Sequence, residues 1–378
     1  MSSFNTTFDG KKLKFARELN GLTLKEVADE MHVSHQSISK WENNRSVPGF
    51  NELEHLGNYL KTGRLFFFST KDLPENNSAT FFRRNISVTK RNRKMAEHNA
   101  KLFSYVESSL SELLNLKYYQ ELNFALSNKK FIQLSPETIE RVANNVRNIF
   151  KAGIGPISNV TLLIERLGIR VAFKDFSLEQ IDAVTESLNN RQYIVINTYN
   201  RSSVRIRFNL AHELGHVLLH SKYSEGEISN SSNRKRIEWE ANYFAGCLLM
   251  PEKGIAQDMV YTNLSYLTEL KNHWKVSIQA LVTRGIQIGL IDETQGLHLR
   301  QQISRNGWRK EEPLDKKLPI EYPIFLKKAI EFNDMSEKSI LNKINYETRL
   351  PMRVIENQLN LYDKNDKTSV VKLKLKLI

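Results

Sequence analysis

Residues 212–216 read His212-Glu213-Leu214-Gly215-His216, and this H-E-x-x-H stretch lies inside an apolar helical pattern. Residues four apart on a helix point the same way, so His212 and His216 can bind one metal ion. The Glu that follows the first His lies beside that metal and can take a proton from bound water. Apolar residues recur at three- and four-residue steps and predict a buried face opposite the two His: Leu210, Ala211, Leu214, Val217 and Leu218. The stretch therefore predicts a zinc-dependent hydrolase site on a buried helix, with Glu213 as the base.

A third metal ligand is expected from a second predicted helix, residues 236–251. Glu238 and Asn242 lie four residues apart, which gives a carboxylate ligand and an amide that can hold a His ring in place. Glu240 is the alternative ligand. It projects about 200° away from Glu238 around the helix, so both cannot face the same metal. Asn242, four residues after Glu238, favours Glu238 as the ligand. The alternative for either Glu is an ordinary charge on a solvated helix face.

Other polar residues near the motif have less defined roles. His220 shares the helical face of His212 and His216, and we expect it to be a partly buried neighbour of the ligands or a surface residue. An oxyanion would need a nearby donor. Tyr223, Tyr261 and His273 are the candidates, and nothing in the sequence favours one of them.

The residues around the motif carry a family resemblance. Residues 207–220, then Glu238-x-x-Ala241-Asn242, then Leu248-Leu249-Met250-Pro251 resemble the ImmA/IrrE family of metallopeptidases, over roughly residues 136–320. This family is zinc-dependent, has a gluzincin-like core, and its known substrates are helix-turn-helix repressors. The resemblance implies Zn²⁺ as cofactor, His212, His216 and Glu238 as its ligands, and Glu213 as base. Asn209 and Cys247 depart from the family pattern, at positions away from these ligands.

A helix-turn-helix pattern occupies the N-terminal region. Thr23 and Glu26 form a capping box at the start of one helix, and Ser34 is an N-cap for the next. Polar residues face outward near the start of the second helix, as in a helix that enters the major groove: His35, Gln36, Ser37 and Lys40.

Residues 38–45, with Pro48 after them, resemble the XRE-type helix-turn-helix of phage repressors. The resemblance implies that His35, Gln36 and Lys40 read bases of a double-stranded DNA operator. It also implies phosphate contacts from Ser37, Asn43 and Arg45. His32 stands in a turn where Gly is frequent, and a positive φ costs more for His than for Gly. A helical domain that makes only protein contacts is the alternative.

Charge and composition limit the partners. The net charge is +13 and the isoelectric point is about 9.5, which favours an anionic partner. Basic residues cluster between positions 83 and 101, where a long helix to about residue 116 is expected. This basic helix either contacts nucleic acid or presents a solvated face. Cys247 is the one cysteine, which excludes an intrachain disulfide, and we expect it in the core. No signal peptide or membrane-length apolar run is visible, so we expect a cytoplasmic protein without membrane contact.

The predicted fold class is α+β, mainly α, in four parts. Residues 9–68 form a five-helix, XRE-type helix-turn-helix domain, and residues 69–135 a linker and the long basic helix, with helix expected throughout 81–134. Residues 136–310 form the ImmA/IrrE-like, gluzincin-like metallopeptidase domain with a small sheet. Residues 311–378 form a small C-terminal helical unit and tail. Strands are expected at 169–173, 183–187 and 193–197, with a hairpin turn at Asn189-Asn190 and a last strand within 370–377. An extended peptide could pair with the strand just before the active-site helix.

Taken together, these patterns favour a DNA-binding transcriptional regulator that carries a zinc endopeptidase. Its substrate would be a helix-turn-helix repressor or the chain itself, cut near residues 70–80. The alternatives are a non-proteolytic transcription factor whose metallopeptidase-like domain senses a ligand, and an antitoxin-like protein that binds a partner. A homodimer is expected if the operator is a palindrome.

Overall fold

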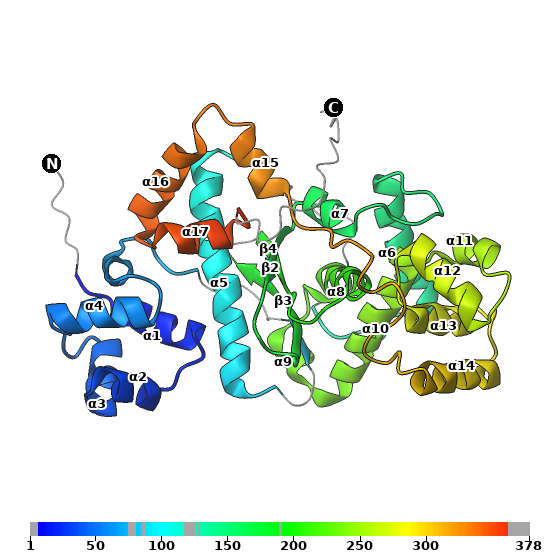
Figure 1. The fold of residues 1–378 in the computed structure, drawn as a ribbon, viewed down its shortest axis with the longest axis horizontal. Helices are drawn as coiled ribbons and strands as arrows, with labels where there is room; N and C mark the ends of the chain where they lie inside the picture. The colour runs from blue at the N-terminus through cyan, green and yellow to red at the C-terminus, as the bar shows by residue number, and fades with distance from the viewer. Residues whose placement is uncertain are drawn as a thin grey trace.

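The computed structural model describes residues 7–74, 81–84, 88–116, 126, 129–188 and 191–361. Within them the chain is mainly helical, with one four-stranded sheet. Figure 1 shows the N-terminal helices on one side of the long helix α5 (Lys90–Leu113) and the sheet on its other side. The predicted class, α+β and mainly α, is confirmed.

The N-terminal domain contains four α-helices and a short 3-10 helix: α1 (Gly10–Leu19), α2 (Leu24–Met31), α3 (His35–Glu42), α4 (Phe50–Tyr59) and η1 (Arg64–Phe68). The fifth predicted helix is thus the 3-10 helix. The capping box is present, because Thr23 N–H donates to Glu26 Oε2 over 2.6 Å and Glu26 N–H donates to Thr23 Oγ1 over 3.1 Å. His32 takes the left-handed conformation expected of it, with φ 53°. These local signals set the end of α2 and the start of α3.

A buried ion pair that the sequence did not indicate ties α1 to α3. The Arg17 guanidinium donates to both carboxylate oxygens of Glu42, over 2.5 and 2.9 Å, and also to the carbonyl of Leu22. Arg17 and Glu42 lie 25 residues apart, so only the packing of the two helices brings them together. A bidentate pair of this kind fixes orientation as well as distance.

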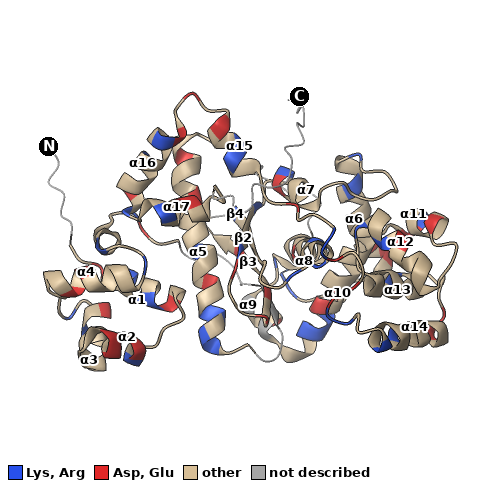
Figure 2. Cartoon of the chain, in the orientation of Figure 1, with Lys and Arg blue, Asp and Glu red and all other residues tan. Residues whose placement is uncertain are grey.

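Helix α5 connects the N-terminal domain to the sheet, because it contacts α1 on one side and β3 and β4 on the other. Lys and Arg gather at the lower end of α5, where the helix begins (Figure 2). Two of them face the N-terminal domain: Lys94 Nζ lies 2.7 Å from Glu18, and Arg91 lies 3.0 Å from Glu26. Burial opposes ionisation of Glu18, but hydrogen bonds from His98 and Lys94 outweigh it and lower its pKa to about 2. Part of the basic cluster therefore holds α5 against the N-terminal helices, and nucleic-acid contact through residues 83–101 stays a prediction.

The strand order in the sheet is β1-β3-β4-β2, with β1 (Phe81–Arg84), β2 (Arg170–Lys174), β3 (Ile181–Leu188) and β4 (Arg191–Asn197). β3 pairs antiparallel with β4, and β2 pairs parallel with β4. The three predicted strands are therefore confirmed. The predicted hairpin turn at 189–190 and the last strand within 370–377 lie outside the described residues.

Two expectations are wrong. Helix does not run throughout 81–134. Residues 81–84 form strand β1, because they pair with β3 about a hundred positions later in the chain, and such pairing leaves no local signal. Residues 129–134 form neither helix nor strand, since α5 ends at Leu113 and the next helix begins at Pro136. A peptide was expected to pair with β4, the strand just before the helix that carries His212 and Glu213, but β4 lies between β3 and β2 and has no open edge. β1 pairs with β3, so β3 is also bonded on both sides.

The sheet separates two cores. Ala183, Ile194 and Ile196 belong to the core around α8 (Ser203–Gly215), whereas Val184 and Val195 belong to the core around α5. Strand residues alternate between faces, and both faces are apolar because helices cover both. The sheet therefore supports α8, which packs on one face of β3 and β4.

The remaining helices surround this centre. α6 (Pro136–Ile149) and α10 (Ser231–Leu249) pack against each other, and α10 also packs against α8. Shorter helices complete the described chain: α7 (Val160–Arg166), α9 (Glu225–Ser229), α11 (Glu252–Asp258), α12 (Leu264–Trp274), α13 (Ile278–Gln287), α14 (Glu293–Arg305), α15 (Phe325–Glu331), α16 (Glu337–Thr348) and α17 (Met352–Gln358). Helices α16 and α17 return to α5, and Cys247 is buried in the core, as expected. None of the described helices is long and apolar enough to cross a membrane.

Candidate metal centre

The H-E-x-x-H stretch lies at the C-terminal end of α8 and runs into a π-helical turn, η2 (His216–His220). Such widened turns are rare and occur mostly at functional sites. Gly215 allows a close approach of α8 to α10, because a Cβ there would lie 3.1 Å from the Phe244 ring and 3.2 Å from the Ala241 Cα. The motif therefore packs directly against α10, the helix that carries Glu238.

His212, His216 and Glu238 offer ligand atoms that all lie within 4.8 Å of one another. The two Nε2 atoms are 3.0 Å apart, and the Glu238 carboxylate lies 3.5 Å from His212 Nε2 and 3.7 Å from His216 Nε2. Ligands around a tetrahedral zinc at about 2.0–2.2 Å lie about 3.4 Å from one another. The three separations lie on either side of that value. Two imidazoles and a carboxylate are also a donor set typical of zinc, so the residues fit this metal.

Both His rings are held through their other nitrogen. His212 Nδ1 lies 3.0 Å from the Asn242 side-chain oxygen, and His216 Nδ1 lies 3.1 Å from His220 Nδ1. Because Asn242 Oδ1 can only accept, His212 must carry its proton on Nδ1, which places the lone pair of Nε2 on the side of His216 and Glu238. The same assignment for His216 makes His220 Nδ1 an acceptor.

His220 extends this arrangement into the core. Its Nε2 lies 3.0 Å from Glu240, and Glu240 also accepts from Arg236 Nε and from the Leu134 N–H, over 2.9 and 2.8 Å. Burial lowers the pKa of His220 and outweighs the opposing effect of Glu240, which favours the neutral ring that this hydrogen-bond chain requires. His220 is a neighbour of a candidate ligand, as one of the two expectations had it, but it is fully buried rather than partly exposed. Glu240 thus faces His220, and Glu238 faces His212 and His216.

Glu213 is buried beside this cluster, where a strand residue orients it. The Thr185 hydroxyl, on β3, donates to Glu213 Oε2 over 2.6 Å. Thr185 lies 28 positions before Glu213, and no local signal marks it. The bond holds one carboxylate oxygen of the predicted base against the sheet.

The candidates for DNA contact lie in α3 or, for Asn43 and Arg45, just after its end, and they are exposed as expected except that Ser37 is half-buried. His35, Gln36, Lys40, Asn43 and Arg45 are exposed. Ser37 instead closes the helix start, because its N–H donates to Ser34 Oγ over 3.1 Å. Ile38 and Trp41 are buried on the opposite face. One side of α3 is therefore free to enter a groove.

Two family models match this chain. Residues 164–284 match the IrrE N-terminal-like domain. Residues 10–62 match a helix-turn-helix domain. The chain joins these two domains. A search among curated proteins finds no match.

The IrrE N-terminal-like domain includes the whole H-E-x-x-H stretch and Glu238, and its family suggests a metallopeptidase-like domain. With the helix-turn-helix match, it describes a DNA-binding regulator that carries a peptidase-like domain. The two family matches confirm the combination that the sequence indicated, an XRE-type helix-turn-helix joined to an ImmA/IrrE-like domain.

The three candidate oxyanion donors lie in different surroundings. Tyr223 is buried, and its hydroxyl donates to the carbonyl of Ile132 over 3.1 Å. Tyr261 is exposed and packs against Tyr266, and the ring of His273 lies 3.4 Å from Asp258. The hydroxyl of Tyr223 is thus already engaged, and the donor role stays a prediction for all three.

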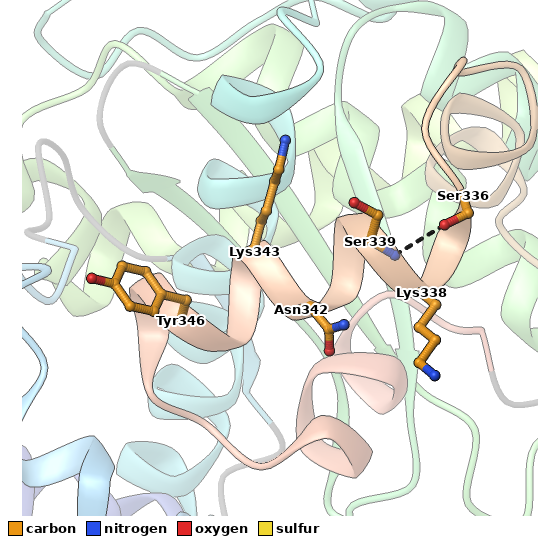
Figure 3. Close-up of a pocket in the computed structure, with 6 residues that line it drawn as sticks. All are labelled: Ser336, Lys338, Ser339, Asn342, Lys343 and Tyr346. Atoms are coloured by element: carbon orange, nitrogen blue, oxygen red, sulfur yellow. Dashed lines mark hydrogen bonds between the residues drawn. The ribbon is translucent and has the colours of Figure 1, made fainter.

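A cavity of about 570 Å³ opens between α8, α10 and α13 next to the metal centre. Asn242, which holds His212, lines it together with four aromatic residues: Phe208, Trp239, Tyr243 and Trp308. A second hollow follows the exposed side of α16, far along the chain from the metal centre (Figure 3). The bond drawn there, from Ser339 N–H to Ser336 Oγ over 3.3 Å, is an ordinary helix cap. Of these two hollows among the described residues, the one lined by Asn242 borders the candidate metal centre.

Proposed function

We propose that this chain is a transcriptional regulator whose IrrE N-terminal-like domain is a zinc-dependent endopeptidase. Its substrate is a repressor protein, or the chain itself. The convergence of His212, His216 and Glu238 next to a buried Glu213 carries the proposal. A purely structural metal site would need no carboxylate held beside its ligands.

His212, His216 and Glu238 would hold the zinc ion, and Asn242 and His220 would keep the two imidazoles oriented. Bound zinc would supply a Lewis acid and lower the pKa of water to near 7. Glu213 would accept the proton of the attacking water and pass it to the leaving amine. Thr185 would keep that carboxylate aligned, because its hydroxyl donates to Glu213 Oε2 over 2.6 Å.

The DNA reader would be α3. His35, Gln36 and Lys40 would contact base edges, and Ser37, Asn43 and Arg45 would contact phosphates of a double-stranded operator. A homodimer would match a palindromic operator. We propose the same domain limits as the sequence indicated, at residues 68, 135 and 310. Cleavage of the repressor or of the chain itself would then switch transcription.

Profiling of protein N-termini in the native host tests the endopeptidase. Cells with the wild-type chain, Glu213→Gln and the exposed control Glu252→Gln are compared, unstressed and after DNA damage. N-termini that appear with the wild type and the control but not with Glu213→Gln would support the proposal and name the substrate. Zinc content of each purified chain shows whether Glu213→Gln lost the base alone. No Glu213-dependent N-terminus under either condition would favour the ligand-sensing regulator.

A further inference from the structure

Strand β3 contacts Glu213 through Thr185. On the side away from β4, its outer edge is covered by β1, a segment of the same chain. β1 pairs antiparallel with β3, with Phe81 opposite Thr185, Phe82 opposite Val184 and Arg84 opposite Ile181. Cα atoms of directly opposed residues in such pairs are about 4.5–5.5 Å apart. The backbone of β1 therefore passes one strand spacing from Thr185, whose hydroxyl lies 2.6 Å from Glu213.

Edge pairing is the usual way in which a sheet binds an extended peptide, because backbone N–H and C=O groups of the edge strand are available. β4 is bonded on both sides, and β2 lies on the far side of β4 from β3. A peptide that reaches Glu213 by pairing with the described sheet must therefore use the outer edge of β3, where β1 lies.

We propose that this edge is the peptide-binding surface of the IrrE N-terminal-like domain and that Phe81–Arg84 occupies it as an internal competitor. A polypeptide from another molecule binds only after β1 leaves. The inference rests on the proposed endopeptidase function for the role of Glu213, but the occupancy itself concerns binding alone.

The character of β1 fits a replaceable occupant. It is four residues long, and its register shifts between Phe82 and Arg84, so few ladder bonds hold it. β1 stays paired with β3 because both belong to the same chain, and a short covalent linker gives an effective concentration on the order of millimolar. It also lies between the helix-turn-helix domain and α5, so the chain that links the DNA reader to the peptidase-like domain covers the edge.

A double proline substitution separates β1 from β3. Successive residues of an antiparallel strand alternate in pointing their N–H at the partner, so Phe81→Pro with Phe82→Pro removes a ladder donor in either register. Phe81→Ile with Phe82→Ile is the matched control, because it keeps both N–H groups and strand propensity. A labelled synthetic peptide with the sequence of residues 79–87 is the probe. Binding is measured by fluorescence anisotropy on zinc-loaded full-length chains that also carry Glu213→Gln.

We expect the proline variant to bind the probe at least tenfold tighter than the parent and the isoleucine control. Hydrogen exchange should show fast β3 amides in the proline variant and their renewed protection when the peptide is added. Equal affinity in all three chains would overturn the inference. If the proline variant fails to fold, replacement of residues 81–84 by Gly-Ser-Gly-Ser provides a second test with the same expected gain.

Cleavage of the same probe by chains that retain Glu213 separates the two proposals. Tighter binding without cleavage by any chain would keep the occupied edge and reject the endopeptidase. Cleavage at equal rates by the wild type and the proline variant would keep the endopeptidase and reject the occupied edge.

Discussion

Substitution of His220 by Leu tests how the metal centre is held. Leu fits an apolar, fully buried position but cannot accept from His216 Nδ1 or donate to Glu240, which lie 3.1 and 3.0 Å from the His220 ring. His216 would keep a buried N–H without an acceptor, which favours the other tautomer or a rotated ring. Both changes take the Nε2 lone pair away from the metal.

The expected loss of zinc affinity is about 10- to 100-fold, the usual effect of removing the partner of a metal-binding His. That corresponds to about 1.4–2.7 kcal/mol. Asn242→Ala removes the partner of His212 in the same way, but Asn242 is exposed, so water can take the place of its oxygen. We therefore expect a loss of about threefold or less for Asn242→Ala, well below the range for buried partners.

Zinc affinity is measured by competition with a chromophoric chelator, and thermal unfolding of the zinc-free chains is measured in parallel. His220→Gln serves as the rescue, because its amide can accept from one neighbour and donate to the other. If His220→Leu binds zinc within twofold of the wild type while the zinc-free chain becomes less stable, the His220–Glu240 chain supports only the core. The reasoning about His216 would then be refuted.

Three further predictions concern packing, pH and DNA. Gly215→Val should lower both the unfolding temperature and zinc affinity, more than Gly215→Ala does, because the added branches push α8 away from α10; equal unfolding temperatures in calorimetry would contradict this. Burial lowers the pKa of Lys174 to about 7 from 10.5, so the unfolded chain gains protons more readily between those values; the free energy of unfolding should rise from pH 7 to 10 in urea titrations, and Lys174→Met should flatten that rise. Arg45→Ala, at a proposed phosphate contact, should weaken DNA binding on all sequences and reduce its salt dependence, whereas Gln36→Ala should cost about 1–3 kcal/mol on the selected site alone. Anisotropy against salt, on DNA selected from a random pool, would separate the two; identical effects would count against base reading by Gln36.

The local features of this protein were predictable from its sequence. The capping box of Thr23 and Glu26 and the N-cap of Ser34 involve residues three positions apart, and the structure has both. The spacing of His212 and His216 on one helical face depends only on helix geometry. The opposite directions of Glu238 and Glu240 follow from the same periodicity, and the three strands from their apolar, β-branched runs.

The tertiary structure decided which distant groups meet. Three side-chain contacts join residues 20 to 28 positions apart: Arg17 with Glu42, His220 with Glu240, and Thr185 with Glu213. β1 pairs with β3 across about a hundred positions. Helix and strand periods determine which way a side chain points within its own element. They do not determine how elements dock, because docking minimises exposed apolar surface summed over the whole core. For that reason the sequence by itself determined the types and spacing of the proposed ligands, and only the packed structure decided what orients Glu213, the proposed base, and what covers the sheet edge beside it.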